Sequence, residues 1–175
     1  LFILNNDTLI KSDCVKQLIS NYIINTIVGP LIYNYDNSNH IQAVGGIVNK
    51  CSLSTQHLKE INIDKINYLP GTALFFNKEI IDIIGFFPEE YFMYYEDVDW
   101  STAAKLNGIS LLINESAVIF HKKRLQLPFY LKTRSIYNRI LYCNKYFKHK
   151  LPVVIVLSLA SFLKLIFIYL FKKYE

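Results

Sequence analysis

The feature that most constrains the fold of this chain is an apolar run from Leu151 to Phe171. At about 1.5 Å per residue, a helix of this length spans roughly the 30 Å hydrocarbon core of a bilayer. Ser158, Ser161 and Lys164 recur at intervals of three and form a polar stripe along that helix. We predict a membrane-spanning helix in preference to a buried core helix. The stripe leaves open that the helix packs against a partner or lies in the membrane interface.

Positive charge is concentrated just before this run. Residues 122–150 contain nine Lys and Arg and no Asp or Glu, whereas residues 1–121 contain 13 acidic and 7 basic residues. Within the basic segment, aromatic residues and cations alternate, and an apolar flank is predicted from Ile136, Ile140 and Phe147, with Tyr137 and Leu141 beside them. The pattern is typical of a basic amphipathic helix at an anionic membrane surface. It also suits nucleic acid, an alternative that the adjoining apolar run disfavours.

The first 121 residues alternate short apolar runs with helical patterns, which indicates an α/β domain with a mixed sheet. Leu1–Leu4 is continuous and apolar, as expected of a central strand. Ile27–Ile32 contains Gly29 and Pro30, as expected of an edge strand or an extended segment. The remaining predicted strands are Ile41–Val44, Thr72–Phe76, Leu111–Ile113 and Ala117–Phe120.

Three helices are predicted between these strands. The first follows a cap at Ser12, and its apolar face is formed by Val15, Leu18, Ile19, Tyr22 and Ile23. The second covers Lys78–Ile84, between a cap at Asn77 and a terminator at Gly85, and the third covers residues 97–107 and ends at Gly108. The stretch Gly45–Lys65 is polar without a clear period, so we expect a loop there.

The stretch Tyr91–Trp100 sets Glu96, Asp97 and Asp99 beside a run of aromatic residues. Charge is costly in such surroundings unless a cation or a substrate proton is present. Acids are also favoured in the first turn of a helix by its dipole, so a structural role stays open. Asp7 and His121 follow predicted strands, where α/β sheets bind ligands, although each alone also fits a structural role.

An ordered set of short motifs resembles the family 2 glycosyltransferases, particularly their rhamnosyltransferase-like branch. The set comprises Asn5-Asn6-Asp7, Gly71-Thr72-Ala73, Gly85-Phe86-Phe87-Pro88-Glu89, Tyr95-Glu96-Asp97-Val98-Asp99, Gly108 and Ala117-Val118-Ile119-Phe120-His121. The resemblance covers about residues 1–150. It implies a Rossmann-like GT-A fold and inverting transfer of a sugar from a nucleotide-sugar donor to an acceptor hydroxyl.

The chain departs from the family pattern at three places. Pro88 stands where the family usually has Asp, and Ala103 where an Arg is common. The family's opening strand–helix units, which hold the nucleotide, would precede Leu1. We therefore expect a partial GT-A domain that lacks its N-terminal units and binds donor poorly by itself.

The resemblance also implies roles for individual residues. Asp97 matches the general base, and Asp7 matches the last acid of the family's metal-binding motif, with His121 completing a site for Mg²⁺ or Mn²⁺. Asn5 and Gly71 belong to the expected donor-binding segments. The residues expected to orient the acceptor or support the loop are Glu96, Asp99, Tyr95 and Trp100.

These observations predict three parts: a partial catalytic domain (1–121), a basic membrane-interface segment (122–150) and a transmembrane helix (151–171). The expected activity is metal-dependent glycosyl transfer in cell-envelope polysaccharide synthesis. The expected partners are a nucleotide-sugar donor, a glycan or lipid-linked acceptor and anionic lipid, but not nucleic acid. The charge bias predicts membrane association with the catalytic part on the cytoplasmic side. The alternatives are a non-catalytic membrane-attached fragment or partner subunit, and a phosphate-binding adaptor that uses only the basic segment.

Overall fold

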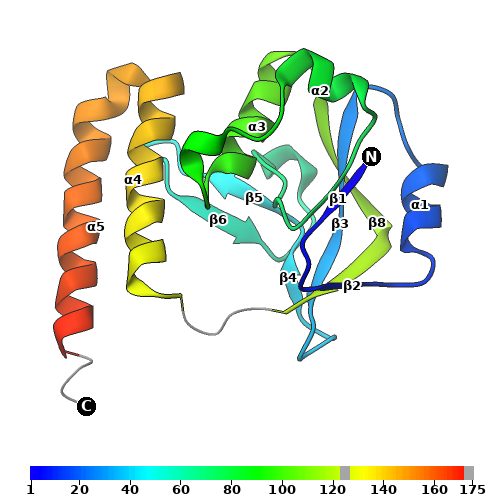
Figure 1. Ribbon diagram of the computed structural model, residues 1–175, viewed down its shortest axis with the longest axis horizontal. Helices are drawn as coiled ribbons and strands as arrows, with labels where there is room; N and C mark the ends of the chain where they lie inside the picture. The colour runs from blue at the N-terminus through cyan, green and yellow to red at the C-terminus, as the bar shows by residue number, and fades with distance from the viewer. Residues whose placement is uncertain (123–126, 172–175) are drawn as a thin grey trace. The chain divides into compact units, whose positions relative to one another are not determined.

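The computed structural model describes residues 1–122 and 127–171, which form two compact units (Figure 1). The first unit contains Leu1–Val48, Thr55–Pro88 and Glu96–Lys123, and the second contains Asn49–Ser54, Glu89–Tyr95 and Arg124–Glu175. The predicted mixed α/β class is confirmed. Several lysines and one arginine of the predicted basic segment and tail lie outside the described residues: Lys123, Arg124, Lys172 and Lys173.

The first unit is built on a six-stranded mixed sheet. Its main path runs β1 (Phe2–Leu4), β7 (Ala73–Phe75), β3 (Thr26–Asn34), β8 (Ser110–His121) and β2 (Thr8–Ile10), and β4 (Ile41–Ala43) also pairs with β3. β3 and β8 are parallel, and the other pairs are antiparallel. Two antiparallel pairings separate β1 from β3, so these strands point the same way. The carboxyl ends of β1, β3 and β8 and the amino end of β7 therefore lie at one edge.

Helices cover both faces of this sheet. α1 (Cys14–Ser20) contributes Cys14 and Leu18 to one buried cluster, whereas α2 (Glu79–Ile84) and α3 (Glu96–Leu106) contribute to the other. Ile27 and Val28 are neighbours in β3 but belong to opposite clusters, because side chains alternate along a strand. Burial of both faces gives the layered α/β arrangement that the sequence predicts.

Trp100 fixes the start of α3 on the sheet. Its side chain is 2 % exposed, and its ring packs on Phe76 and Phe87 with centroid separations of 4.9 and 4.8 Å. The indole Nε1–H donates a 2.9 Å hydrogen bond to the carbonyl of Gly85, so the one polar atom of the ring is satisfied. This anchoring sets where the acidic first turn of α3 lies.

Two predicted strand positions are wrong. The segment Leu1–Leu4 contains β1, which is at the end of the strand path and, among the described strands, pairs with β7 alone. Ile27–Ile32 lies in β3, which has a neighbouring strand on each side. The interior position tolerates Pro30 because the register to β8 shifts between Pro30 and Leu31. A bulge at this point removes the need for the ladder hydrogen bond that proline cannot donate.

Two segments that the sequence predicts as separate strands form the single strand β8. Asn114 Oδ1 accepts hydrogen bonds from the backbone N–H groups of Ser116 and Ala117, at 3.0 and 3.2 Å. This local irregularity coincides with the polar residues that the pattern presents as a break. Pairing with β3 resumes at Val118 and continues to His121.

The predicted loop Gly45–Lys65 contains regular structure. β5 (Gly45–Val48) and β6 (Thr55–Leu58) form an antiparallel pair, and η1 (Ile63–Lys65) is a 3₁₀ turn. Gln56 and His57 are both exposed in β6, which conceals the alternation that identifies a half-buried strand.

The predicted apolar face of the first helix is also wrong. α1 begins at Cys14, with Asp13 rather than Ser12 at its N-cap. Leu18 is buried, but Val15 and Ile19 are 41 % and 61 % exposed. A helix of two turns buries only the single row of residues spaced four apart, which here begins at Cys14.

The second unit contains a helical hairpin. α4 (Phe129–Tyr146) is followed by the short η3 (Lys148–Lys150) and by α5 (Leu151–Phe171), which has the predicted bounds and lies beside α4 (Figure 1). α5 is long and apolar enough to cross a membrane. The apolar flank predicted for α4 is not its buried face; the buried side chains are Leu131, Asn138, Arg139, Tyr142 and Cys143. The buried Nδ2 of Asn138 and the guanidinium of Arg139 both have hydrogen-bond partners, whereas Oδ1 of Asn138 has none among the described residues.

Candidate functional site

Asp97 lies in the first turn of α3, and backbone N–H groups hold both of its oxygens. Oδ2 accepts a 2.9 Å hydrogen bond from Gly71, and Oδ1 accepts a 2.8 Å bond from Val98. A Cβ on Gly71 would lie 3.3 Å from the Cβ of Asp97, so glycine permits this close approach. Burial raises the pKa of Asp97, although both N–H donors favour its charged form.

Glu96 precedes Asp97 and has a different environment. Burial and then the charge of Asp97 raise the pKa of Glu96 to about 7. Its buried Oε2 has no hydrogen-bond partner among the described residues. Since Asp97 receives two backbone N–H groups, we assign the proton that the pair retains near neutral pH to Glu96. Asp97 is then the ionised member and the available base.

Asp7 and His121 form a pair at the same edge of the sheet. His121 Nε2 lies 3.2 Å from Asp7 Oδ1, and the carbonyl of Asp7 accepts a 3.1 Å hydrogen bond from Lys122. The pairing of β2 with β8 sets this contact, because Thr8, which follows Asp7, is opposite His121. The amide of Gln42, in β4, lies 2.9 Å from Nδ1 of His121 and fixes the orientation of the ring.

A short series of backbone contacts joins this pair to Asp97. β1 ends at Leu4, and the N–H of Asn5 donates a 3.0 Å hydrogen bond to the carbonyl of Thr72. Thr72 follows Gly71, which binds Asp97, and Asn5 lies two residues before Asp7. The structure therefore brings the predicted donor, metal and base residues to one edge of the sheet.

Two of these side chains fit a divalent metal. In residues 1–122 and 127–171 there is no group of three or more His, Cys, Asp or Glu side chains that could hold a metal ion. Asp7 and His121 could supply two ligands, and Mg²⁺ or Mn²⁺ commonly takes its other ligands from substrate phosphate and water. Oε1 of Gln42 lies 3.2 Å from Nδ1 of His121 and can accept a hydrogen bond from the Nδ1–H group when Nε2 is a ligand, the usual support of a metal-bound histidine.

Sequence reasoning missed Gln42. The only available signal was a single amide in a short strand between Ile41 and Ala43. Because one polar residue in a strand is common, that signal does not point to a site until His121 is located beside it.

Three further predicted residues are buried. Asp99, Trp100 and Tyr95 are 2 %, 2 % and 4 % exposed. The Tyr95 hydroxyl donates a 2.7 Å hydrogen bond to the carbonyl of Leu53, within the second unit. Of the two predicted roles, acceptor contact or support, burial favours support for all three.

In the second unit, the loop that leads into α3 has an unusual backbone. Three of its non-glycine residues have φ between 59° and 72°: Phe92, Tyr94 and Tyr95. Such conformations cost on the order of 1 kcal/mol or more each and persist only where the surroundings hold them. The buried Nδ2 of Asn138 lies 2.7–2.8 Å from three carbonyls of this loop, those of Tyr91, Met93 and Tyr94. Asn138 therefore stabilises the loop in this conformation.

Arg134 also binds this loop, because its Nε donates a 3.3 Å hydrogen bond to the carbonyl of Tyr91. Asn138 and Arg134 together form a clamp on the loop. Sequence reasoning counted Arg134 as part of a basic surface and missed Asn138. An amide within a basic helix gives no sign of which backbone groups it binds.

No protein-family model matches the chain, and no curated protein matches it. The resemblance to glycosyltransferases thus stays a prediction.

Removing the amide of Asn138 is expected to destabilise the second unit. In the full-length protein, Asn138→Ala should lower the free energy of unfolding by about 2–4 kcal/mol, because each buried carbonyl left without a donor costs about 1–3 kcal/mol. Asn144→Ala is the matched control, since Asn144 lies on the same helix and is exposed; it should change stability by at most about 0.5 kcal/mol. Urea denaturation measures both, and equal effects would contradict the clamp.

The raised pKa of Glu96 predicts a pH-dependent stability difference. Between its ordinary value of 4.5 and about 7, the folded state binds this proton more tightly than the unfolded state, so stability falls as pH rises through that window. Glu96→Gln removes the effect. The free energy of unfolding of the variant, taken relative to that of the parent protein, should increase by roughly 1–3 kcal/mol from pH 4.5 to pH 8.

Thermal and urea unfolding over this pH range measure that gain. The exposed Glu115→Gln serves as the control for a lost negative charge. If the difference in free energy of unfolding between Glu96→Gln and the parent protein is the same at every pH, the predicted rise in the pKa of Glu96 is wrong.

Proposed function

We propose that this chain is the catalytic part of a metal-dependent, inverting glycosyltransferase that moves a sugar from a nucleotide-sugar donor to the hydroxyl of a lipid-linked glycan. The observation that carries the proposal is the series of contacts joining Asp97 through Gly71, Thr72 and Asn5 to the Asp7–His121 pair. The motif resemblance assigns roles to these same residues. A GT-A fold is proposed together with the activity.

In this proposal Asp97 is the general base. Each carboxylate oxygen accepts one backbone hydrogen bond and keeps a second lone pair. The acceptor hydroxyl transfers its proton to Asp97 while its oxygen forms a bond to the anomeric carbon, and the bond from that carbon to the donor phosphate breaks on the opposite side. The raised pKa of Asp97 makes it a stronger base than an exposed aspartate.

Asp7 and His121 hold the divalent cation in this proposal. Gln42 orients His121, and Asn5 and Gly71 form the backbone wall beside the donor. When bound, Mg²⁺ or Mn²⁺ neutralises charge on the departing nucleoside diphosphate. The N–H groups of Gly71 and Val98 hold the carboxylate of the base in one orientation.

The proposed setting is the cytoplasmic face of a membrane. α5 is predominantly apolar, and residues 122–150 before it contain nine Lys and Arg and no Asp or Glu, a charge that the anionic cytoplasmic leaflet attracts. Nucleotide sugars and lipid-linked acceptors meet at such a face, which suits the assembly of cell-envelope polysaccharides.

Asp97→Asn in the full-length protein tests the assignment of the base. With Mn²⁺ and a panel of UDP-, GDP- and dTDP-sugars, we expect transfer to fall about 10²- to 10⁴-fold, the usual contribution of a general base. Donor binding measured by calorimetry should change less than about threefold, because Asp97 acts on the acceptor. Asp82→Asn, on the exposed side of α2, is the control and should keep full activity.

Folding of Asp97→Asn is checked by thermal unfolding, since the amide can accept only one of the two N–H groups. Transfer at the parent rate by a folded Asp97→Asn protein would contradict the base assignment. A parent protein that transfers no sugar with or without Mn²⁺ would favour the non-catalytic alternative.

A further inference from the structure

Side-chain contacts hold α4 and α5 together near one end and near the middle of the hairpin. The rings of Phe129 and Tyr169 lie with centroids 4.9 Å apart near one end. Near the middle, the buried Arg139 donates hydrogen bonds to Ser158 at 2.9 Å and to Ser161 at 3.3 Å. The polar stripe of α5 thus faces α4, and the two helices form one element.

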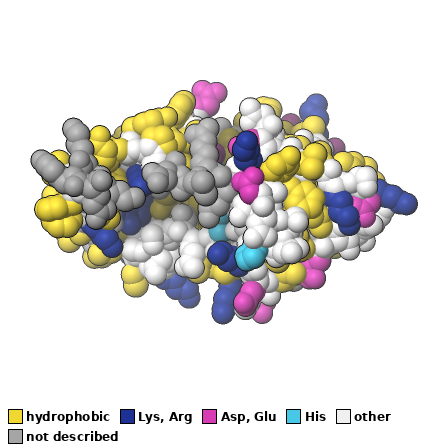
Figure 2. Space-filling model, turned by 90° about the horizontal axis from the view of Figure 1, so that it is seen from below, with side chains coloured by type: hydrophobic (Ala, Val, Ile, Leu, Met, Phe, Trp, Pro, Cys, Tyr) yellow, Lys and Arg dark blue, Asp and Glu magenta, His cyan; other side chains and the backbone are white. Residues whose placement is uncertain are grey.

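The other side of α5 has no cover in the described residues. Only Val154 and Ser158 of its 21 residues are buried. Large apolar side chains are exposed along the whole helix: Val153, Val156, Leu159, Leu163, Phe167 and Leu170. Hydrophobic side chains accordingly reach the surface over α4 and α5 in Figure 2, with Lys and Arg side chains among them. An apolar face of this length is unfavourable in water and requires an apolar environment.

The pairing with α4 limits how this face can meet a membrane. If α5 stood across the bilayer, α4 would stand beside it and carry Lys132, Arg134 and Arg139 into the hydrocarbon, together with Lys164 of α5. Cations at that depth are strongly disfavoured. If the hairpin lies flat, the apolar face of α5 enters the interface while the cations of α4 stay at headgroup level. The contacts therefore favour an interfacial hairpin over the span that the sequence predicts.

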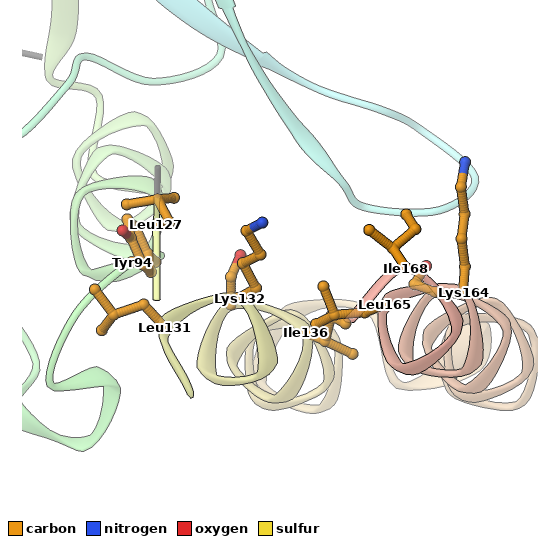
Figure 3. A pocket seen from close by; sticks show the side chains of 10 residues that line it. Tyr94, Leu127, Leu131, Lys132, Ile136, Lys164, Leu165 and Ile168 are labelled. Carbon is orange, nitrogen blue, oxygen red and sulfur yellow. The ribbon is translucent and has the colours of Figure 1, made fainter. Parts of the chain in front are cut away.

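A groove of about 350 Å³ lies between the two helices. Leu131 and Ile136 of α4 and Leu165 of α5 give it an apolar lining. Lys132 and Lys164 also line it, and Figure 3 shows both side chains extending toward the same side of the helix pair. Among the described residues, no acidic side chain lines the groove and neither lysine forms an ion pair.

We propose that this groove binds the terminal phosphate of a membrane lipid, from a hairpin that lies in the membrane interface. Two ammonium groups match the charge of nearly −2 that a phosphate monoester carries at neutral pH. The hydroxyl of Ser135 adds a donor beside them. The apolar lining accommodates the start of an acyl chain, which selects a lipid over free phosphate. This binding stands independently of the proposed sugar transfer.

Vesicle co-sedimentation of the full-length protein tests the groove. Phosphatidylcholine vesicles carry either phosphatidic acid, which has a terminal phosphate, or phosphatidylserine at matched surface charge. The parent protein should bind the first about tenfold more tightly, and Lys132→Gln with Lys164→Gln should abolish this preference. Lys145→Gln with Lys148→Gln removes the same charge outside the groove and should keep the preference.

Each other outcome overturns the proposal. Equal binding of both vesicles by the parent protein, or equal loss of preference in both double variants, would mean that diffuse charge attracts the hairpin. Release of the protein from phosphatidic acid vesicles by inorganic phosphate, but not by chloride at the same ionic strength, would mean that free phosphate is the ligand.

The interfacial placement has its own measurement. Leu151→Cys and Phe171→Cys are each made in a Cys51→Ser background, and each protein is added to preformed vesicles. A membrane-impermeant maleimide is then added to the solution outside the vesicles. Both positions should react without opening the vesicles. Reaction of position 171 only after the vesicles are opened would show that α5 spans, and would overturn the interfacial placement.

Discussion

The backbone N–H of Gly71 bound to the carboxylate of Asp97 is the interaction on which this account depends. A carboxylate in half-buried surroundings is costly, and here two N–H groups offset part of that cost. The contact also ties the first turn of α3 to the entry of β7. Trp100 keeps α3 in place from within the core, so the acid is positioned by packing rather than by a mobile loop.

The second unit relies on buried polar contacts of the same kind. Asn138 binds carbonyls of a loop with left-handed backbone, and Arg139 binds serines of α5. In each case a polar helix residue is buried because a partner element supplies hydrogen-bonding groups. α4 therefore faces two partners at once, and its apolar pattern alone describes neither face.

The sequence predicts elements whose signals are local and misses features that depend on pairing. α3, β7 and the bounds of α5 follow from glycine terminators and continuous apolarity. The positions of β1 and β3 in the sheet do not, since strand order depends on contacts between distant segments. For the site, the sequence identifies Asp7, Asp97 and His121 as residues at the ends of elements. Gln42 is identified only once β4 is known to pair with β3, which also pairs with β8, the strand that ends at His121.

The most direct measurement of the central claim is paramagnetic broadening by Mn²⁺ in the full-length protein. If Asp7 and His121 bind the cation at the edge where Asp97 lies, backbone amide signals of Asn5 and Gly71 should broaden first. Signals at the other end of β3 and β8, where Thr26 pairs with Ser110, should broaden last. Asp7→Asn should abolish the early broadening. Broadening that begins at Thr26, or that persists unchanged in Asp7→Asn, would contradict a metal site at this edge.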